Sequence, residues 1–385
     1  MNQVCKREDC TGCGLCSCMC PKGAIKMEES KDTGHYVPVI NQNICVDCHI
    51  CVKYCPVFQT PDTKKVLKTY VAWRTNQEAQ LGSSSGGVAA AFYETAIANG
   101  YYVVGAYFND ELKLQMKCTS SLDECEKFKG SKYIQADNNN VYSEALFALK
   151  SGKKILFIGT PCQCAAIRSA GRVYNDKLLT VELICHGTPS QKIFLEYIHA
   201  ISQKKHRNIS GVSFRSSWGV EMCLTDQNKE FWKYKVNEDD YLVAFQNGVL
   251  HNNACYHCKY AHKNRCSDMT IGDFWKIGET IPFQKPKCRV SVLIVNSIKG
   301  MNFLNSCSNL HLEEREYEEA LTGNPNLYRP SKKSPLYDVF WNEYHSKGIE
   351  AAMKKIGGKD LAKKRIKNKM VETTKSIIKR FLGMC

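Results

Sequence analysis

A cysteine pattern that occurs twice within the first sixty residues constrains this chain more than any other feature. The run C-x2-C-x2-C-x3-C-P stands at residues 10–21 and again at residues 45–56. Three closely spaced thiolates wrap one 4Fe-4S cluster, and the fourth ligand comes from elsewhere in the chain. Zinc ribbons also use C-x2-C pairs, but without the third and fourth cysteines and the proline of this run. The repeat therefore predicts a domain that holds two 4Fe-4S clusters and transfers electrons.

The two runs are expected to exchange one ligand each. In two-cluster domains the remote cysteine of each run binds the cluster of the other run. We assign one cluster to Cys10, Cys13, Cys16 and Cys55, and the other to Cys45, Cys48, Cys51 and Cys20. Cys5 and Cys18 lie outside the pattern and are expected to be spare thiols.

Length and composition limit the class of protein. A chain of 385 residues is too long for one ferredoxin unit and suggests two or three domains. The first residues lack the apolar core of a signal peptide, and no stretch approaches eighteen apolar residues. Clusters and free thiols indicate a reducing compartment, so the expected location is cytoplasmic.

The net charge of +15 is concentrated near the C-terminus. Residues 349–385 contain eleven Lys and Arg against three Asp and Glu, and their apolar residues fall near helical spacing. This pattern predicts a basic amphipathic helix over 346–385. Such a helix can pack on its own protein, lie on an anionic membrane surface or bind an acidic partner. Because no nucleic-acid motif accompanies the charge, we expect no nucleic acid as a partner.

Beyond a polar linker, apolar β-favouring segments alternate with helical ones. This alternation predicts an α/β domain with a mainly parallel sheet, after an α+β ferredoxin-like two-cluster domain. The expected domains are 1–60, 61–205, 206–345 and 346–385. The expected strands are 66–73, 101–108, 154–158 and 178–184, and the expected helices include 88–98, 141–149, a segment ending at 167, and 193–201.

Three loops of the α/β region are candidate binding segments. Two strand-to-helix turns, 159–163 and 187–191, read Gly-Thr-Pro-Cys-Gln and Gly-Thr-Pro-Ser-Gln, so each Thr can be an N-cap and each Pro the first helical residue. Loops at the carboxyl ends of parallel strands are where open α/β sheets bind ligands. The Ser/Gly loop at 83–87 precedes a helix and suits a phosphate or pyrophosphate, although it matches no Rossmann or Walker pattern.

A third set of cysteines appears farther along the chain. The pair Cys255-x2-Cys258 is by itself ambiguous between zinc, a redox dithiol and a cluster. It needs two further ligands. Cys162 and Cys185 follow neighbouring strands and should share one edge of the sheet, while Cys266 is close in sequence.

Taken in order, these motifs resemble the family of coenzyme F-420 hydrogenase/dehydrogenase beta subunits, in its bacterial branch with a fused ferredoxin domain. The resemblance runs from about residue 5 to about 320 and includes Gly130-Ser131-Lys132-Tyr133, Cys185-His186-Gly187 and Gly272-Asp273-Phe274-Trp275. It implies FAD and a third 4Fe-4S cluster. The implied flavin-side residues are Ser85, Gly86, Gly87, Ser131, Lys132, Tyr133 and Thr160, and the implied ligands of the third cluster are Cys162, Cys185, Cys255 and Cys258.

The resemblance leaves Cys266 as a bystander, because that position is not usually cysteine in relatives. The fused ferredoxin and the Cys-His-Gly and Gly-Asp-Phe-Trp segments depart from the deazaflavin-reducing members, which puts a deazaflavin substrate in doubt. The expected function is an iron–sulfur flavoprotein oxidoreductase that exchanges electrons with a redox partner protein or reduced carrier. The alternatives are a non-catalytic electron-transfer subunit and a cluster-containing docking protein. His186 is the best proton-donor candidate, against a purely structural role.

Overall fold

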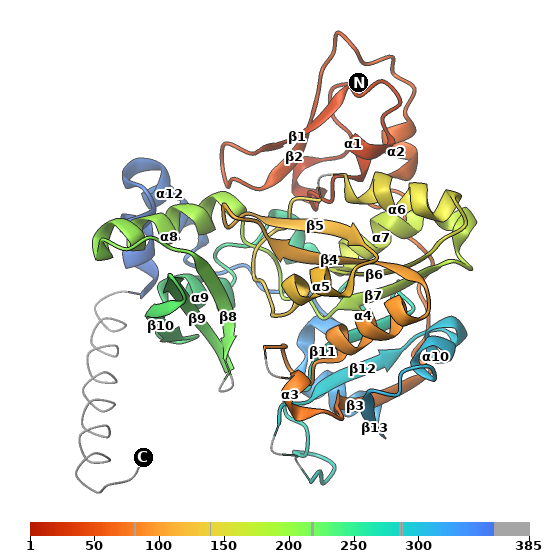
Figure 1. Ribbon diagram of the computed structural model, residues 1–385. Coiled ribbons are helices and arrows are strands. Elements are labelled where there is room, and N and C mark those ends of the chain that lie inside the picture. Colours follow the sequence, from red (N-terminus) through yellow and green to blue (C-terminus); the bar gives the residue numbers. More distant parts are fainter. Residues whose placement is uncertain (81, 139, 217–218, 285, 287, 358–385) are drawn as a thin grey trace, which may run out of the picture. The chain divides into compact units, whose positions relative to one another are not determined.

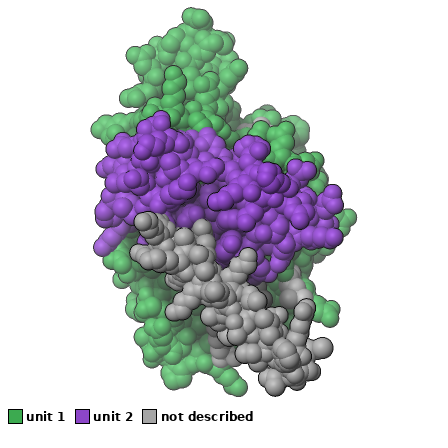
Figure 2. Space-filling view, turned by 90° about the vertical axis from the view of Figure 1, so that its left-hand side faces the viewer, with its two compact units in different colours: residues 1–192, 251–331 green, residues 193–250, 332–385 purple. Residues whose placement is uncertain are grey.

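The computed structural model describes residues 1–80, 82–138, 140–216, 219–284, 286 and 288–357. The chain divides into two compact units, residues 1–192 with 251–331 and residues 193–250 with 332–385, coloured separately in Figure 2. The division into four predicted domains stays a prediction. Residues 349–357 are helical, and the rest of the predicted C-terminal helix lies outside the described residues. No helix in the described part of the chain is long and apolar enough to span a membrane.

The ferredoxin portion has two short helices, and each helix ends just before the fourth cysteine of a run. Cys20 and Cys55 are the C-caps of these helices, and Pro21 and Pro56 come directly after them. Gly12 has a φ of +66°, and a Cβ there would lie 2.5 Å from the carbonyl oxygen of Tyr36, so only glycine fits this loop. The elements are η1 Arg7–Asp9, α1 Leu15–Met19, α2 Ile50–Tyr54 and the antiparallel pair β1 Ile25–Glu29 and β2 Tyr36–Ile40.

An eight-stranded sheet in the order β13-β3-β12-β11-β7-β6-β4-β5 forms the centre of the first unit (Figure 1). Its central strands β4, β6, β7 and β11 pair in parallel, as the sequence predicts. The strands are β3 Lys68–Arg74, β4 Tyr101–Phe108, β5 Leu114–Thr119, β6 Lys154–Gly159, β7 Leu178–Leu183, β11 Met269–Asp273, β12 Ser291–Val295 and β13 Leu310–Glu314.

The edges of the sheet correct the expectation of a mainly parallel sheet. Strand β5 pairs antiparallel with β4, and β12 and β13 pair antiparallel with their neighbours. The short turn between β4 and β5 returns the chain directly, and a connection this short can only form a hairpin. The predicted strands at 66–73, 101–108, 154–158 and 178–184 are confirmed to within a few residues.

Helices cover both faces of the sheet. On one face Leu156 and Ile158 of β6 belong to one buried apolar cluster with residues of α4 and α10, while on the other face Phe157 stacks on Tyr142 of α6. In Figure 1 helices α6 and α7 lie between the sheet and the ferredoxin helices α1 and α2. The helices of this unit are α3 Gln77–Gln80, α4 Val88–Ala98, α5 Leu122–Cys125, η2 Glu126–Phe128, α6 Val141–Lys150, α7 Pro161–Ala170, η3 Arg172–Tyr174, η4 Asn253–His257, α10 Ile298–Leu304, α11 Tyr317–Gly323 and η5 Pro325–Leu327.

The second unit contains a small antiparallel sheet in the order β10-β9-β8. The buried Asp239 caps α9 by accepting a hydrogen bond from Leu242 N at 3.1 Å, and it also accepts from Tyr197 Oη and Trp232 Nε1. This carboxylate therefore ties helix and sheet together. The elements are α8 Gln191–Lys205, which begins in the first unit, β8 Gly211–Ser216, β9 Gly219–Asp226, β10 Lys229–Lys235, α9 Asp240–Gln246 and α12 Tyr337–Lys347.

Candidate functional site

The first set of cysteines gathers as the crossed assignment requires. Burial raises the pKa of Cys13, and the neighbouring thiolates of Cys10 and Cys55 raise it further. Cys16 is buried, and its pKa is raised by burial and by the thiolates of Cys13, Cys10 and Cys55. Cys55, although 39 residues from Cys16 in sequence, is thus a neighbour of the other three.

The second set lines one small hollow at the surface. Cys20, Cys45, Cys48 and Cys51 all contribute to it, together with Lys22. Cys20 therefore lies with the three cysteines of the other run, as the crossed assignment requires. Cys48 is exposed, in contrast to the other members of both sets.

The third set comes together through backbone pairing between two distant segments. Pro189 pairs antiparallel with His251, and Asn252 N donates to the carbonyl oxygen of Thr188 at 3.1 Å. This pairing aligns the segment after Cys185 with the segment before Cys255. The resulting set is Cys162, Cys185, Cys255 and Cys258. Burial raises the pKa of Cys185, and the charges of the other three thiolates raise it further. Burial and the charges of Cys258 and Cys162 raise the pKa of Cys255 to about 12.

Cys266 also packs beside Cys162 and Cys258, but its thiol is directed to a different group. Its Sγ lies 3.1 Å from Oε2 of the buried Glu182, which also pairs with Arg265. The contact with this buried ion pair explains the position of the Cys266 thiol, and no metal is needed to explain it. The described geometry is thus compatible with Cys266 as a bystander, which stays a prediction.

Single metal ions and 4Fe-4S clusters require different spacing of the ligand sulfurs. Among the residues with described positions, no three His, Cys, Asp or Glu side chains converge tightly enough to hold one ion. A tetrahedral zinc ion would hold four sulfurs within about 4 Å of one another. In a 4Fe-4S cluster each thiolate binds a different iron, so the four sulfurs stand farther apart.

A buried tyrosine next to these sulfurs has no hydrogen-bond partner. Tyr142 is fully buried, and its Oη finds no donor or acceptor among the described residues. Burial raises the pKa of Tyr142, and the charges of the Cys13 and Cys162 thiolates raise it further. A buried hydroxyl without a partner costs about 1–3 kcal/mol. Cluster sulfur would supply the missing acceptor, so the residues present fit such a group.

A continuous chain of hydrogen bonds joins the first set of cysteines to the third. Asn138 Nδ2 donates to the carbonyl oxygen of Cys13 at 2.8 Å, and Gln163 Nε2 donates to Asn138 Oδ1 at 2.7 Å. The backbone N–H of Thr160 donates to Gln163 Oε1 at 2.8 Å, and the Oγ1 of Thr160 lies 3.2 Å from the Sγ of Cys162. The two sets are therefore held at a fixed position within one unit.

A second connection joins the same two regions. Lys259 Nζ donates to the carbonyl oxygen of Val57 and to Thr60 Oγ1, both at 2.7 Å. Tyr260 Oη lies 3.4 Å from the carbonyl oxygen of Pro56, the residue after Cys55, and its ring packs beside the third set. The segment after Cys258 is thus attached to the segment after Cys55.

Two of the three flavin-side segments are in direct contact. The backbone N–H of Ser131 donates to Ser84 Oγ at 2.6 Å, and the two hydroxyls lie 2.8 Å apart. Ser85 Oγ donates to the carbonyl oxygen of Val290, which precedes β12. Thr160 lies at the end of β6, at the same edge of the sheet but three strand positions from β12.

Gly86 and Gly87 are required by the fold itself. A Cβ at Gly86 would lie 2.2 Å from the carbonyl oxygen of Ala72, and Gly87 has a φ of +77° beside the Arg74 side chain. Loss of flavin from a Gly87 variant would therefore not locate a pyrophosphate, because the loop would be strained without any ligand.

Features of this loop nevertheless fit an anionic group. Helix α4 begins after Gly87 without a side-chain cap, and Ser83 Oγ is buried with no partner in the described part of the chain. Lys132 Nζ is held by the carbonyl oxygens of Phe128, Lys129 and Gly130, and burial lowers the pKa of Lys132 to about 7. A bound phosphate would supply a partner for the hydroxyl and a counter-charge for the lysine.

The two Gly-Thr-Pro turns, at residues 159–163 and 187–191, differ in structure. Thr160 is the N-cap of α7, with Pro161 in the first turn and Gln163 completing a capping box. At the second turn Pro189 is instead paired with His251, and α8 begins at Gln191. Thr188 and Pro189 therefore precede the helix, because the backbone pairing that aligns the third set keeps this turn extended, and the predicted helix at 193–201 lies within α8.

Sequence reasoning missed several residues around the site. Asn138, Tyr142 and Lys259 belong to no motif, and their roles depend on contacts between distant segments. His186 was singled out, and in the structure its Nδ1 lies 3.2 Å from Asn326 Oδ1 while its carbonyl oxygen accepts from Ser331. These contacts are those of a structural histidine, and its role as a proton donor stays untested.

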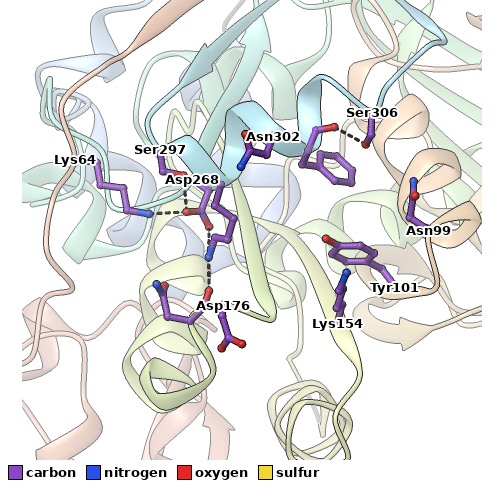
Figure 3. A pocket seen from close by; sticks show the side chains of 12 residues that line it. Lys64, Asn99, Tyr101, Lys154, Asp176, Asp268, Ser297, Asn302 and Ser306 are labelled. Atoms are coloured by element: carbon purple, nitrogen blue, oxygen red, sulfur yellow. Dashed lines mark hydrogen bonds and ion pairs between the residues drawn. The ribbon is translucent and has the colours of Figure 1, made fainter.

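A cavity of about 660 Å³ lies at the opposite, amino edge of the parallel strands (Figure 3). Its wall includes Asp268, which is fully buried and accepts from Lys64 Nζ at 2.6 Å and Ser297 Oγ at 2.8 Å. Lys299 and Arg168 are also within 4 Å of this carboxylate. Burial opposes ionisation, but the charges of Lys64 and Lys299 prevail and hold the pKa of Asp268 at about 2. The cluster anchors the linker after the ferredoxin portion.

Comparisons with known proteins agree with this architecture. Residues 9–58 match the family described as 4Fe-4S dicluster domain, and residues 152–320 match the C terminus of the coenzyme F420 hydrogenase/dehydrogenase beta subunit. Residues 152–320 therefore form a domain of this beta-subunit family, and residues 9–58 form an N-terminal 4Fe-4S ferredoxin domain.

Individual relatives are distant. The F subunit of the F(420)H(2) dehydrogenase of Methanosarcina mazei is 23% identical over 266 residues, which is 66% of this chain and 73% of that protein. An uncharacterized polyferredoxin-like protein of Methanocaldococcus jannaschii is 45% identical over 58 residues, about a third of its length. A chain of the F420-reducing NiFe hydrogenase complex of Methanosarcina barkeri has a TM-score of 0.47 and 16% identity, covering 76% of this chain and 92% of that one. At the coarse level the protein is an iron–sulfur electron-transfer protein of the oxidoreductase class.

Proposed function

We propose that the chain is an iron–sulfur flavoprotein oxidoreductase that holds three 4Fe-4S clusters and FAD and reduces or oxidises an organic substrate or carrier. When bound, FAD supplies the exchange between single electrons and electron pairs that a 4Fe-4S cluster lacks. The observation that carries the proposal is the hydrogen-bonded chain from Cys13 through Asn138, Gln163 and Thr160 to Cys162.

The proposed order of the clusters rests on contacts between the residues that would hold them. The second set reaches the surface at Cys48. The first set lies against the third set through Asn138 and Tyr260, and the third set lies at the sheet edge that carries Thr160. Fixed spacing between redox centres matters because electron transfer slows steeply with distance. The ferredoxin portion is therefore proposed as a rigid relay and not as a mobile carrier.

The experiment that tests this proposal removes only the third cluster. The variant Cys258→Ala is reconstituted anaerobically with iron, sulfide and FAD, and is then reduced with one-electron equivalents. We expect the ferredoxin clusters to be reduced normally and the flavin absorbance near 450 nm to bleach far more slowly than in the wild type. Flavin reduction at the wild-type rate would contradict a path through the third set.

Ser83→Ala tests the flavin position. Ser83 Oγ has no partner in the described protein, so its removal should leave the fold unchanged. We expect FAD affinity to fall about tenfold, which corresponds to one lost hydrogen bond to a charged group. The matched control is Ser306→Ala, whose hydroxyl lies at the opposite cavity and should leave FAD affinity unchanged. Equal FAD affinity in all three proteins would place the phosphate elsewhere.

The second candidate function is a non-catalytic electron-transfer subunit whose partner holds the substrate site. The name of the Methanosarcina mazei relative, which describes one subunit of a dehydrogenase, favours this alternative. Turnover of an organic substrate by the purified, fully loaded chain alone would favour the enzyme.

A further inference from the structure

The surface around Cys48 is the point where the relay is accessible from outside. Of the twelve cysteines assigned to the three sets, Cys48 alone is exposed. The loop over residues 41–49 is exposed at every position except Cys45. The first and third sets, by contrast, face each other inside the unit. Among these cysteines, Cys48 is therefore the ligand that an external redox protein can approach most closely.

Apolar side chains make this loop suited to protein contact. Val46 is 58% exposed and Ile44 is 44% exposed. Val46 lines the same hollow as Cys48 and the exposed Lys22. Large apolar side chains beside an exposed metal ligand are typical of small, transient interfaces, which bury little area and still exclude water from the contact.

The charge of this surface indicates the kind of partner. Lys22 and Lys53 are exposed, and Lys53 follows His49 by one helical turn, on the same face of α2. The acid within the loop is Asp47, so the two lysines leave a positive balance of charge beside Cys48. The side chains of this surface thus present positive charge and apolar area together. Such a surface attracts an acidic protein and repels a basic one.

We propose that the surface formed by Lys22, Ile44, Val46, Cys48, His49 and Lys53 docks an acidic one-electron carrier protein of the ferredoxin class. This inference rests on the proposed function, because it assumes that the second set holds a cluster. One electron passes per encounter: the carrier is oxidised by one electron, the second cluster is reduced by one electron, and no proton or bond is exchanged. The reverse transfer uses the same contact.

Stopped-flow reduction tests the docking surface directly. The probe is reduced plant-type 2Fe-2S ferredoxin, mixed with the anaerobically loaded full chain at several ionic strengths. We expect the double charge reversal Lys22→Glu/Lys53→Glu to lower the second-order rate constant roughly tenfold at low salt and to remove most of its salt dependence. Val46→Ser should weaken binding of the oxidised carrier, measured by calorimetry, without changing the salt dependence.

Two controls separate docking from damage to the relay. Lys153→Glu changes another exposed lysine, which precedes β6, and should leave the rate constant within about twofold of the wild type. Reduction of the double variant by a zwitterionic viologen should proceed at the wild-type rate. Wild-type rates with ferredoxin in the double variant, or an equal loss in Lys153→Glu, would overturn the docking surface. Absence of the second cluster from the loaded wild type, read from iron content and electron paramagnetic resonance, would instead overturn the proposed function and the docking surface with it.

Discussion

Replacement of single cysteines in the third set gives the sharpest structural prediction. Cys185 follows β7 and Cys266 precedes the neighbouring strand β11, and the two cysteines differ in what surrounds the sulfur. Cys185 lies among Cys255, Cys162 and Cys258, whereas Cys266 contacts the Glu182 carboxylate. We therefore expect Cys185→Ala to lose one of four anchors of a cluster and Cys266→Ala to lose none.

The expected magnitudes follow from these surroundings. A fully loaded chain should contain about twelve irons, and Cys185→Ala should lower this by about four. Cys266→Ala removes a small buried group and one weak hydrogen bond, so it should keep all the iron and cost roughly 1–2 kcal/mol of unfolding free energy. The assay is iron and sulfide analysis after anaerobic reconstitution, with urea unfolding of the same samples.

The converse pattern would refute this assignment. Loss of about four irons in Cys266→Ala, with full retention in Cys185→Ala, would mean that Cys266 is the fourth ligand in place of Cys185. Closeness in sequence to Cys258 would then decide the ligand, and not the pairing of Pro189 with His251. The third cluster would then lie away from the end of β7.

Three further predictions concern single side chains. Asp268→Asn should lower the free energy of unfolding by about 3–5 kcal/mol at pH 7, because Lys64 and Lys299 would then face each other without their shared carboxylate. In the wild type, the pKa of Asp268 falls from 3.8 to about 2 on folding, so its stabilisation is complete above about pH 4 and is lost as the pH falls toward 2, which acid-unfolding curves would detect. Tyr142→Phe should leave the cluster-free protein equally or more stable but lower the midpoint potential of a neighbouring cluster, because a donated hydrogen bond favours the reduced cluster; an unchanged redox titration would refute this role. FAD affinity should weaken as the pH rises above about 7, where the free protein loses the proton of Lys132, and Lys132→Arg should show no such pH dependence; parallel pH profiles would exclude Lys132 as the counter-charge.

The strands and the two-cluster domain could be predicted because their signals are local. The strands from 101 to 183 and the capped turn at Thr160 depend on residues adjacent in sequence, and both were confirmed. The two cysteine runs lie within the match to a 4Fe-4S dicluster domain, while the ligand sets stay a prediction. The antiparallel edges of the sheet were not predicted, since strand order depends on long-range pairing such as β3 with β12 and β13.

The contacts between distant segments were beyond sequence reasoning for the same reason. Nothing near Asn138 indicates that its amide lies between Cys13 and Gln163. The Thr-Pro turn at 188 has the same residues as the turn at 160, yet its pairing with His251 keeps it extended. The helix therefore begins two residues after Pro189, at Gln191.

The most direct test of the central claim is electron paramagnetic resonance of the fully reduced, fully loaded chain. The claim is that the first and third sets hold neighbouring clusters in a fixed arrangement. It predicts three reduced clusters per chain, with a magnetic interaction that disappears in Cys185→Ala while the interaction within the ferredoxin pair remains. Two clusters per chain, with a spectrum that Cys185→Ala leaves unchanged, would contradict the account.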